Sequence, residues 1–190
     1  MTAATRATID PVTGLLRGVR QVLSPHFNRR PQGQQPDLIV VHGISLPPGE
    51  YGERWVDRFF CGNLPPDAHP YFAKIASLRV SAHAMIARDG CITQYVSFHE
   101  RAWHAGESSY AGRSGCNDFS IGIELEGGDD APYEDAQYVV LADLIKALRN
   151  VYVELTHDRI AGHNDIAPGR KSDPGLLFDW SHLQRLLAHR

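Results

Sequence analysis

The sequence predicts one α/β domain with a mixed central β-sheet flanked by helices. Its length of 190 residues suits a single compact domain over residues 1–190, in which residues 1–8 are expected to be flexible. Strand-like and helical segments mix along the chain without strict alternation, and a hairpin near its middle requires antiparallel pairing. A sheet with both parallel and antiparallel strands accommodates all of these observations.

The first predicted strand leads into a long irregular segment. Residues 37–42 are an apolar run with β-branched residues at its centre and His42 at its end, a pattern typical of a buried strand. Residues 43–78 are rich in proline and glycine and contain one short helical stretch near residues 53–60. Loops of this length in compact domains tend to be functional, so we expect this segment to take part in function.

Two further strands form the predicted hairpin. Residues 81–88 and 91–97 are strand-like runs joined by Asp89-Gly90. An Asp-Gly pair supplies the positive φ values of a tight two-residue turn, which predicts such a turn here.

The second half of the chain contains two further predicted strands and two predicted helices. Residues 119–126 form a predicted strand with Ile121, Ile123 and Leu125 on one face and Gly122, Glu124 and Glu126 on the other. Residues 135–153 have helical spacing, with one apolar face made of Val139, Ala142, Ile145, Leu148 and Tyr152. A short strand is expected over residues 159–163, and Asp179 is expected to cap a final helix over residues 180–189.

Composition excludes several classes of partner. The net charge is −3 and no lysine- or arginine-rich block occurs, which argues against nucleic acid. No window approaches the roughly 18 apolar residues that cross a bilayer. The first ten residues lack the apolar core of an export signal, so we expect a cytoplasmic location. The three cysteines, Cys61, Cys91 and Cys116, are widely spaced and are read as reduced thiols.

Two histidines and one aspartate lie where predicted strands give way to loops. His42 ends the first strand, His163 opens a second irregular stretch, and Asp173 lies within that stretch. Two imidazoles and a carboxylate can hold a catalytic zinc ion and leave a fourth position for water. The alternative is that these histidines are hydrogen-bonded structural residues, and spacing alone favours it because no His-Glu-x-x-His motif links two ligands.

Glu124 is the candidate general base. It shares a strand with apolar neighbours but points to the opposite face, from which it could take a proton from the attacking water. A solvated strand carboxylate is the alternative reading, and Glu126 has the same facing, so alternation leaves both open.

Other polar groups lie near these residues in the sequence. Lys171, two residues before Asp173, could stabilise an oxyanion, or it could be an ordinary exposed lysine. Trp103 and His104 join an aromatic ring to an imidazole, and they could stack on a substrate or simply pack a loop.

Together these segments resemble the AmpD-type N-acetylmuramoyl-L-alanine amidases. The resemblance covers residues 12–180 and rests on ordered motifs: VHGISLPPG at 41–49, HPYF at 69–72, LRVSAH at 78–83, RAWHAG at 101–106, NDFSIGIELEG at 117–127, GH at 162–163, RKSDPG at 170–175 and FDW at 178–180. The sequence departs from the family pattern at Gly43, Gly115, Asn164 and Gly169. None of these departures removes a ligand or the base, but Gly43 and Gly115 affect the expected fine contacts with substrate.

The resemblance implies a function and a role for each site residue. It implies that His42, His163 and Asp173 bind one Zn²⁺ ion, that Glu124 is the general base and that Lys171 stabilises the substrate oxygen. It places four residues at the substrate cleft: Tyr71, Arg79, Trp103 and His104. The implied fold is shared with peptidoglycan recognition proteins.

The implied substrate is a 1,6-anhydro-muropeptide, cleaved between the muramic lactyl group and L-alanine during cytoplasmic peptidoglycan recycling. The resemblance also implies that the activity can lower β-lactamase induction, by removing the muropeptides that signal it. We expect a monomer without nucleic-acid or membrane partners. Two alternatives remain: a non-catalytic peptidoglycan-binding module, and a lytic amidase that acts on intact cell wall.

Overall fold

The computed structural model describes residues 7–52 and 54–189. The strands are β1 (Arg20–Gln21), β2 (Phe27–Asn28), β3 (Leu38–Ile44), β4 (Ala84–Ile86), β5 (Ile92–Gln94), β6 (Arg101–Ala102), β7 (Ser109–Tyr110), β8 (Arg113–Ser114), β9 (Ser120–Glu126) and β10 (Ile160–Gly162). The helices are α1 (Trp55–Phe60), α2 (Phe72–Ile75), α3 (Asp135–Val151), α4 (His163–Ile166) and α5 (Trp180–Ala188), with a 3₁₀ turn, η1, at Cys116–Asp118.

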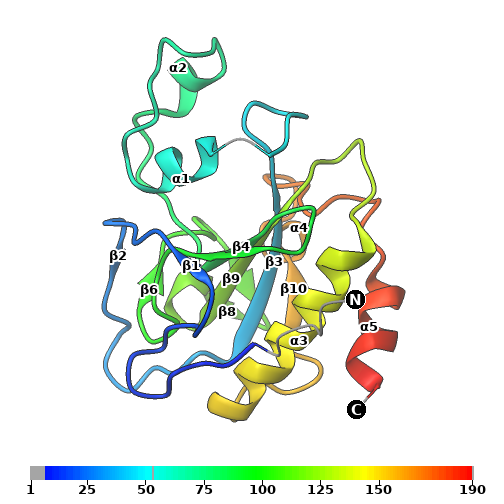
Figure 1. Cartoon of the computed structure of the whole chain (residues 1–190). Coiled ribbons are helices and arrows are strands. Elements are labelled where there is room, and N and C mark those ends of the chain that lie inside the picture. Colours follow the sequence, from blue (N-terminus) through cyan, green and yellow to red (C-terminus); the bar gives the residue numbers. More distant parts are fainter. Residues whose placement is uncertain (1–6, 53, 190) are drawn as a thin grey trace.

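The central sheet is mixed, as the sequence predicts. Its six strands run in the order β1-β5-β4-β9-β3-β10, and only the β4–β5 pair is antiparallel. Figure 1 shows α3 and α5 side by side against one face of this sheet, and α1 and α2 in a separate segment above it. The fold class of a mixed sheet flanked by helices is therefore confirmed.

Both faces of the central strands are covered. Alternate residues of β3 and β9 pack with α3 and α5 in the main core, which includes Ile39, Val41, Ile121, Ile123 and Leu125. The residues between them point to the opposite face of the sheet, and those of β9 are buried there as well. The polar side chains of this second face are therefore carried by a buried strand that pairs with a neighbour on each side, and not by a loop.

Helix α3 buries a slightly different stripe from the predicted one. Ala142, Ile145 and Leu148 are buried as expected, but the side chain of Val139 is 39% exposed. Tyr138 takes its place in the core. Each helical residue turns the side chain by about 100°, so Val139 lies one step outside the stripe that faces the sheet.

The hairpin forms, but the prediction of a two-residue turn is wrong. The Ala87 N–H donates to the Cys91 carbonyl and the Gly90 N–H donates to the Ala87 carbonyl, each over 2.9 Å, so three residues form the loop. Gly90 alone in this loop has a positive φ, +86°. The Asp89 carboxylate instead accepts a hydrogen bond from the Cys91 N–H at 2.9 Å, a geometry that suits a three-residue loop ending in glycine.

The structure describes only part of the N-terminal segment that the sequence predicts to be flexible. Residues 1–6 of this segment lie outside the described residues. Of the remaining two residues, Thr8 accepts a 2.8 Å hydrogen bond at its carbonyl from the Arg17 N–H. That residues 1–190 form one domain stays a prediction.

Asp179 caps α5 as expected, accepting a 2.8 Å hydrogen bond from the His182 N–H. No helix in the described ranges has the length and apolar character needed to cross a membrane.

Candidate metal centre and active site

The register of three parallel strands brings the main site residues together. Val41 of β3 pairs with Gly162 of β10, and His42 pairs with Glu124 of β9. His163 follows Gly162 directly, so the next position along each strand places His163, His42 and Glu124 in one row. Because Val41 points into the α3 side of the sheet, His42 points to the opposite face.

Asp173 completes a tight group with the two histidines. Its Oδ2 atom lies 2.9 Å from His163 Nδ1 and 3.2 Å from His42 Nδ1, and the two Nδ1 atoms are 2.9 Å apart. The three ligand atoms form a compact group of the kind that can hold a metal ion. Both imidazoles are buried and Asp173 is half-buried.

The outer nitrogens of both imidazoles have partners of their own. His163 Nε2 lies 3.3 Å from the Ala105 carbonyl, which can only accept, so Nε2 carries the proton and Nδ1 presents a lone pair. His42 Nε2 lies 2.9 Å from His104 Nδ1. Two imidazole nitrogens and one carboxylate oxygen, backed by such partners, are a donor set that fits zinc.

The charge states also suit a cation. Burial lowers the pKa of His42 to about 4, so the ring is neutral at pH 7. Burial alone would raise the pKa of Asp173, but the two imidazoles in contact with it, His163 and His42, outweigh this effect and hold the pKa far below its usual range. Metal ligands must be deprotonated, and both groups meet that requirement.

Two hydrogen bonds fix the loop that carries Asp173. The Asn164 N–H donates to the Asp173 carbonyl over 2.9 Å, and the Tyr133 hydroxyl donates to the Pro174 carbonyl over 2.9 Å. The Tyr133 ring is buried against Gly43, where an added Cβ would overlap its hydroxyl oxygen. Glycine at position 43 therefore makes room for the Tyr133 ring.

This packing predicts a coupled pair of substitutions. Gly43→Ala should lower the free energy of unfolding by about 1–3 kcal/mol, because the methyl group overlaps the Tyr133 hydroxyl. In a Tyr133→Phe background the same change should cost much less, since the nearest ring atom would then be Cζ at 3.5 Å, an ordinary contact. Urea unfolding of the four proteins in this double-mutant cycle measures the coupling. Additive effects would contradict the proposed contact.

Glu124 is buried beside the metal-ligand group without a complete set of partners. Its side chain is 8% exposed, and Oε2 has no hydrogen-bond partner among the described residues. Burial raises the pKa of Glu124 well above its ordinary value; the charge of Asp173 adds to this effect and Lys171 opposes it. A buried carboxylate with a free oxygen and a raised pKa is suited to exchange protons with a ligand in the groove.

Glu126, which alternation could not separate from Glu124, has a different role. Its two carboxylate oxygens accept hydrogen bonds from the Gly52 N–H at 2.6 Å and the Arg88 N–H at 3.2 Å. These bonds tie the end of β9 to two loops. The geometry thus distinguishes a structural carboxylate from the one that faces the ligand atoms.

A groove of about 500 Å³ opens over these residues. Lys171, exposed at its rim, lies close enough for its charge to lower the pKa values of His42 and Glu124. Tyr71, Trp103 and His104 also line it. The remaining lining is apolar near α1 and α2 and polar near Asp173, and includes Leu46, Phe59, Phe60, Ile75, Leu78, Val80, Asp129, Arg170 and Ser172.

Trp103 is held as a fixed surface in the groove. Its indole Nε1–H donates to the Asn28 side chain over 2.7 Å, and its ring stacks on His26 with 6.0 Å between centroids. An aromatic ring anchored in this way can pack against the face of a sugar or a peptide group.

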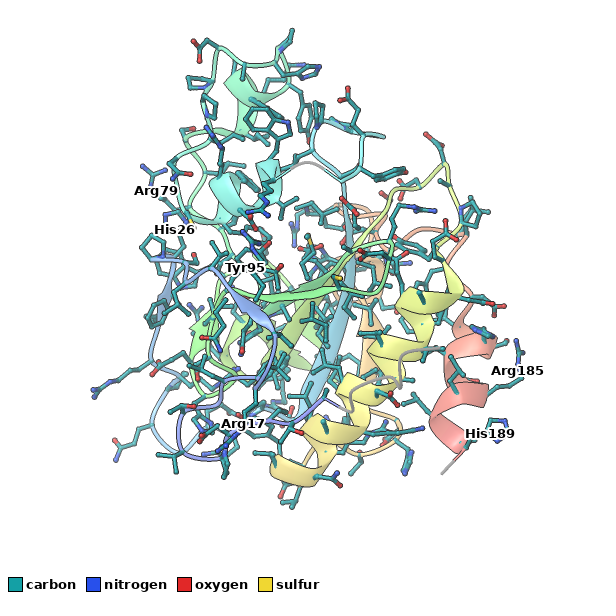
Figure 2. The ribbon with its side chains drawn as sticks, viewed as in Figure 1. Arg17, His26, Arg79, Tyr95, Arg185 and His189 are labelled. Carbon is teal, nitrogen blue, oxygen red and sulfur yellow. The ribbon has the colours of Figure 1, made fainter. Side chains whose placement is uncertain are left out.

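Arg79 lies elsewhere. It is not among the groove-lining residues that the structure describes, and its guanidinium donates to the Ser77 and Leu78 carbonyls at 3.2 and 3.4 Å. Figure 2 shows it at the side of the molecule near His26. A role for Arg79 in substrate binding remains a prediction that this geometry does not support.

Some residues that shape the site were not singled out from the sequence. Tyr133 lies far along the chain from Pro174, whose carbonyl it holds. Asn117 and Ala105 fall within motifs of the family resemblance, but those motifs do not show that an amide oxygen and a backbone carbonyl would position the histidines. No spacing rule identifies such contacts, because they depend on how loops fold over the sheet.

A donor set that fits a divalent metal, lying in a groove beside a buried carboxylate, is typical of a metal-dependent hydrolase. The profile of the N-acetylmuramoyl-L-alanine amidase family matches residues 32–176, and the chain belongs to this family. The resemblance seen in the motifs is thereby confirmed.

Individual relatives and solved structures point to the same family. The chain is 56% identical over 175 residues to the 1,6-anhydro-N-acetylmuramyl-L-alanine amidase AmpD of Escherichia coli K12, covering 92% of this chain and 95% of the relative. A crystal structure of a Se-Met AmpD derivative superimposes with a TM-score of 0.91 at 55% identity, covering 94% of this chain and 98% of that one. The E. coli amidase AmiD, solved with the substrate anhydro-N-acetylmuramic acid-L-Ala-D-γ-Glu-L-Lys, matches with a TM-score of 0.58 at 31% identity, over 83% of this chain and 60% of that one.

Proposed function

We propose that this protein is a zinc-dependent amidase that hydrolyses the bond between the lactyl group of 1,6-anhydro-N-acetylmuramic acid and L-alanine in soluble muropeptides. One observation carries the proposal: His42, His163 and Asp173 converge within a groove beside Glu124, a buried carboxylate with a free oxygen. The names of the AmpD relatives and the substrate of the AmiD complex support this choice of substrate.

The chain's own residues divide the chemistry among them. A zinc ion bound by the donor set supplies a Lewis acid and water that is acidic enough to attack near neutral pH. Glu124 accepts the proton of the attacking water and returns it to the departing L-alanine nitrogen. Lys171 places a cation where negative charge develops on the carbonyl oxygen. Cleavage of the amide bond between the lactyl group and L-alanine then yields the anhydro sugar and the free stem peptide.

The groove residues orient the substrate. Trp103, fixed by Asn28 and His26, offers a rigid aromatic surface, and Tyr71 adds a second ring at the apolar end. His104 borders the same groove, although its ring nitrogens are both engaged inside the protein. We therefore propose that Tyr71 and Trp103, rather than His104, make the main contacts with the substrate.

The proposed setting is peptidoglycan recycling in the cytoplasm, with an indirect effect on β-lactamase induction through removal of anhydro-muropeptides. The protein would act as a monomer without nucleic-acid or membrane partners. The net charge of −3 and the absence of a basic block are consistent with a small soluble substrate.

Comparison of two substrates separates this proposal from its alternatives. Purified protein should release stem peptide from soluble anhydro-muropeptides rapidly and from intact sacculi slowly or not at all. Efficient cleavage of sacculi would favour the lytic amidase. Binding of muropeptide without any cleavage, in the presence of zinc, would favour the non-catalytic module. Chromatography of the released peptides provides the readout for both substrates.

A further inference from the structure

We infer that the segment His104–Ala105 sets the orientation and tautomer of both histidine ligands, and that His104 is a positioning residue for His42. The inference deepens the proposed function and rests on it, because it concerns the metal centre of the proposed enzyme. It assigns to His104 a role other than the substrate contact expected from the sequence.

A chain of hydrogen bonds determines which His42 nitrogen is free. The Ser120 hydroxyl donates its one proton to the Cys116 carbonyl over 2.6 Å, so towards His104 Nε2, 3.2 Å away, its oxygen must accept. His104 therefore carries its proton on Nε2 and presents a bare Nδ1. This Nδ1 lies 2.9 Å from His42 Nε2 and accepts its proton, which leaves the Nδ1 of His42 free to bind a metal.

Ala105, the residue after His104, contacts the second histidine ligand, His163. The Ala105 carbonyl accepts from His163 Nε2 at 3.3 Å and from the Arg170 guanidinium at 2.6 Å. The side chain of Asn117 fixes this two-residue segment, because its Oδ1 accepts from the backbone N–H groups of His104 and Ala105 at 3.1 and 2.8 Å. One short segment thus presents a bare Nδ1 on each imidazole towards Asp173.

The sheet makes space for the His104 ring. Gly122 of β9 lies directly beneath it, and a Cβ added to Gly122 would overlap the imidazole. The His104 ring also meets the His42 ring edge-on, with 5.0 Å between centroids. Glycine at this strand position is therefore required for His104 to reach His42, an observation independent of the hydrogen bonds.

The test compares zinc affinity in three proteins. His104→Leu keeps the bulk of the side chain but removes the acceptor, and it should weaken zinc binding by about 10–100-fold, the usual effect of losing such a partner. His104→Asn places an amide oxygen near the position of Nδ1 and should recover most of that loss. Competition with a chelator of known affinity measures each dissociation constant, and thermal melting of the metal-free proteins reports folding.

Controls separate a specific role from a general one. His157→Leu, at an exposed histidine outside the groove, should bind zinc as the wild type does. If His104→Leu does not fold, Gly122→Ala displaces the same ring without altering its chemistry and should also weaken zinc binding. Wild-type affinity in His104→Leu, or equal losses in the Leu and Asn variants, would overturn the inference. A wild-type chain that bound no zinc would instead refute the proposed function itself, before any variant is compared.

Discussion

Glu124→Gln is expected to lower kcat by about 10²–10⁴-fold while zinc stays bound, because glutamine matches the shape of the carboxylate but cannot accept a proton. The Glu124 carboxylate is buried opposite His42 in the strand register, and its Oε2 is free to meet a ligand in the groove. Steady-state hydrolysis of one defined anhydro-muropeptide, together with measurement of bound zinc, gives both quantities.

Glu126→Gln is the matched control for this experiment. It lies on the same strand and the same face, but its oxygens are engaged by the Gly52 and Arg88 backbone. The control should lose some stability and keep its turnover. Near-normal turnover in Glu124→Gln with zinc retained would exclude Glu124 as the base.

Asp173→Ala should remove most of the bound zinc and with it the activity. Asp173 supplies the anionic ligand of the group, and its loss leaves two imidazoles, which carry no negative charge, to hold a dication. We expect zinc affinity to fall by more than the roughly 10–100-fold that loss of an outer hydrogen-bond partner causes. A Lewis acid contributes several kcal/mol to such reactions, so turnover should fall by about 10³-fold or more.

Asp129→Ala is the control for zinc content. Asp129 lines the same groove and accepts a 2.7 Å hydrogen bond from the Ser172 hydroxyl, but its carboxylate is not part of the ligand group. Metal analysis after dialysis should find wild-type zinc in this variant and little in Asp173→Ala. Equal zinc in all three proteins would show that the ion binds elsewhere.

The fold was predictable where hydrophobic patterning is strong. The apolar run ending at His42, the alternation of Ile121, Ile123 and Leu125, and the spacing in residues 135–153 all correspond to elements of the structure. Strands β1, β2, β6, β7 and β8 were not predictable, because each has two residues and two residues define no period. The hairpin turn was predicted with the wrong loop length because the Asp89 side chain, which closes the turn, competes with the backbone geometry assumed for Asp-Gly.

The site was predictable only in part. The prediction that His42 ends its strand is wrong, because β3 continues to Ile44, and Glu124 likewise lies inside β9. His42, His163 and Glu124 come together because the strands pair in parallel register, and strand order was the missing information. The separation of Glu124 from Glu126 needed the loops that contact Glu126. Tyr133, Asn117 and Ala105 act through packing and backbone hydrogen bonds between distant segments, for which a single sequence contains no pattern.

The most direct measurement is a mass spectrum of the products from one defined anhydro-muropeptide, recorded for untreated, chelator-treated and zinc-restored protein. The account predicts two new masses, those of the anhydro sugar with an intact lactyl acid and of the free stem peptide, which vanish with the chelator and return with zinc. Cleavage at another bond, or the same cleavage unaffected by metal removal, would contradict it.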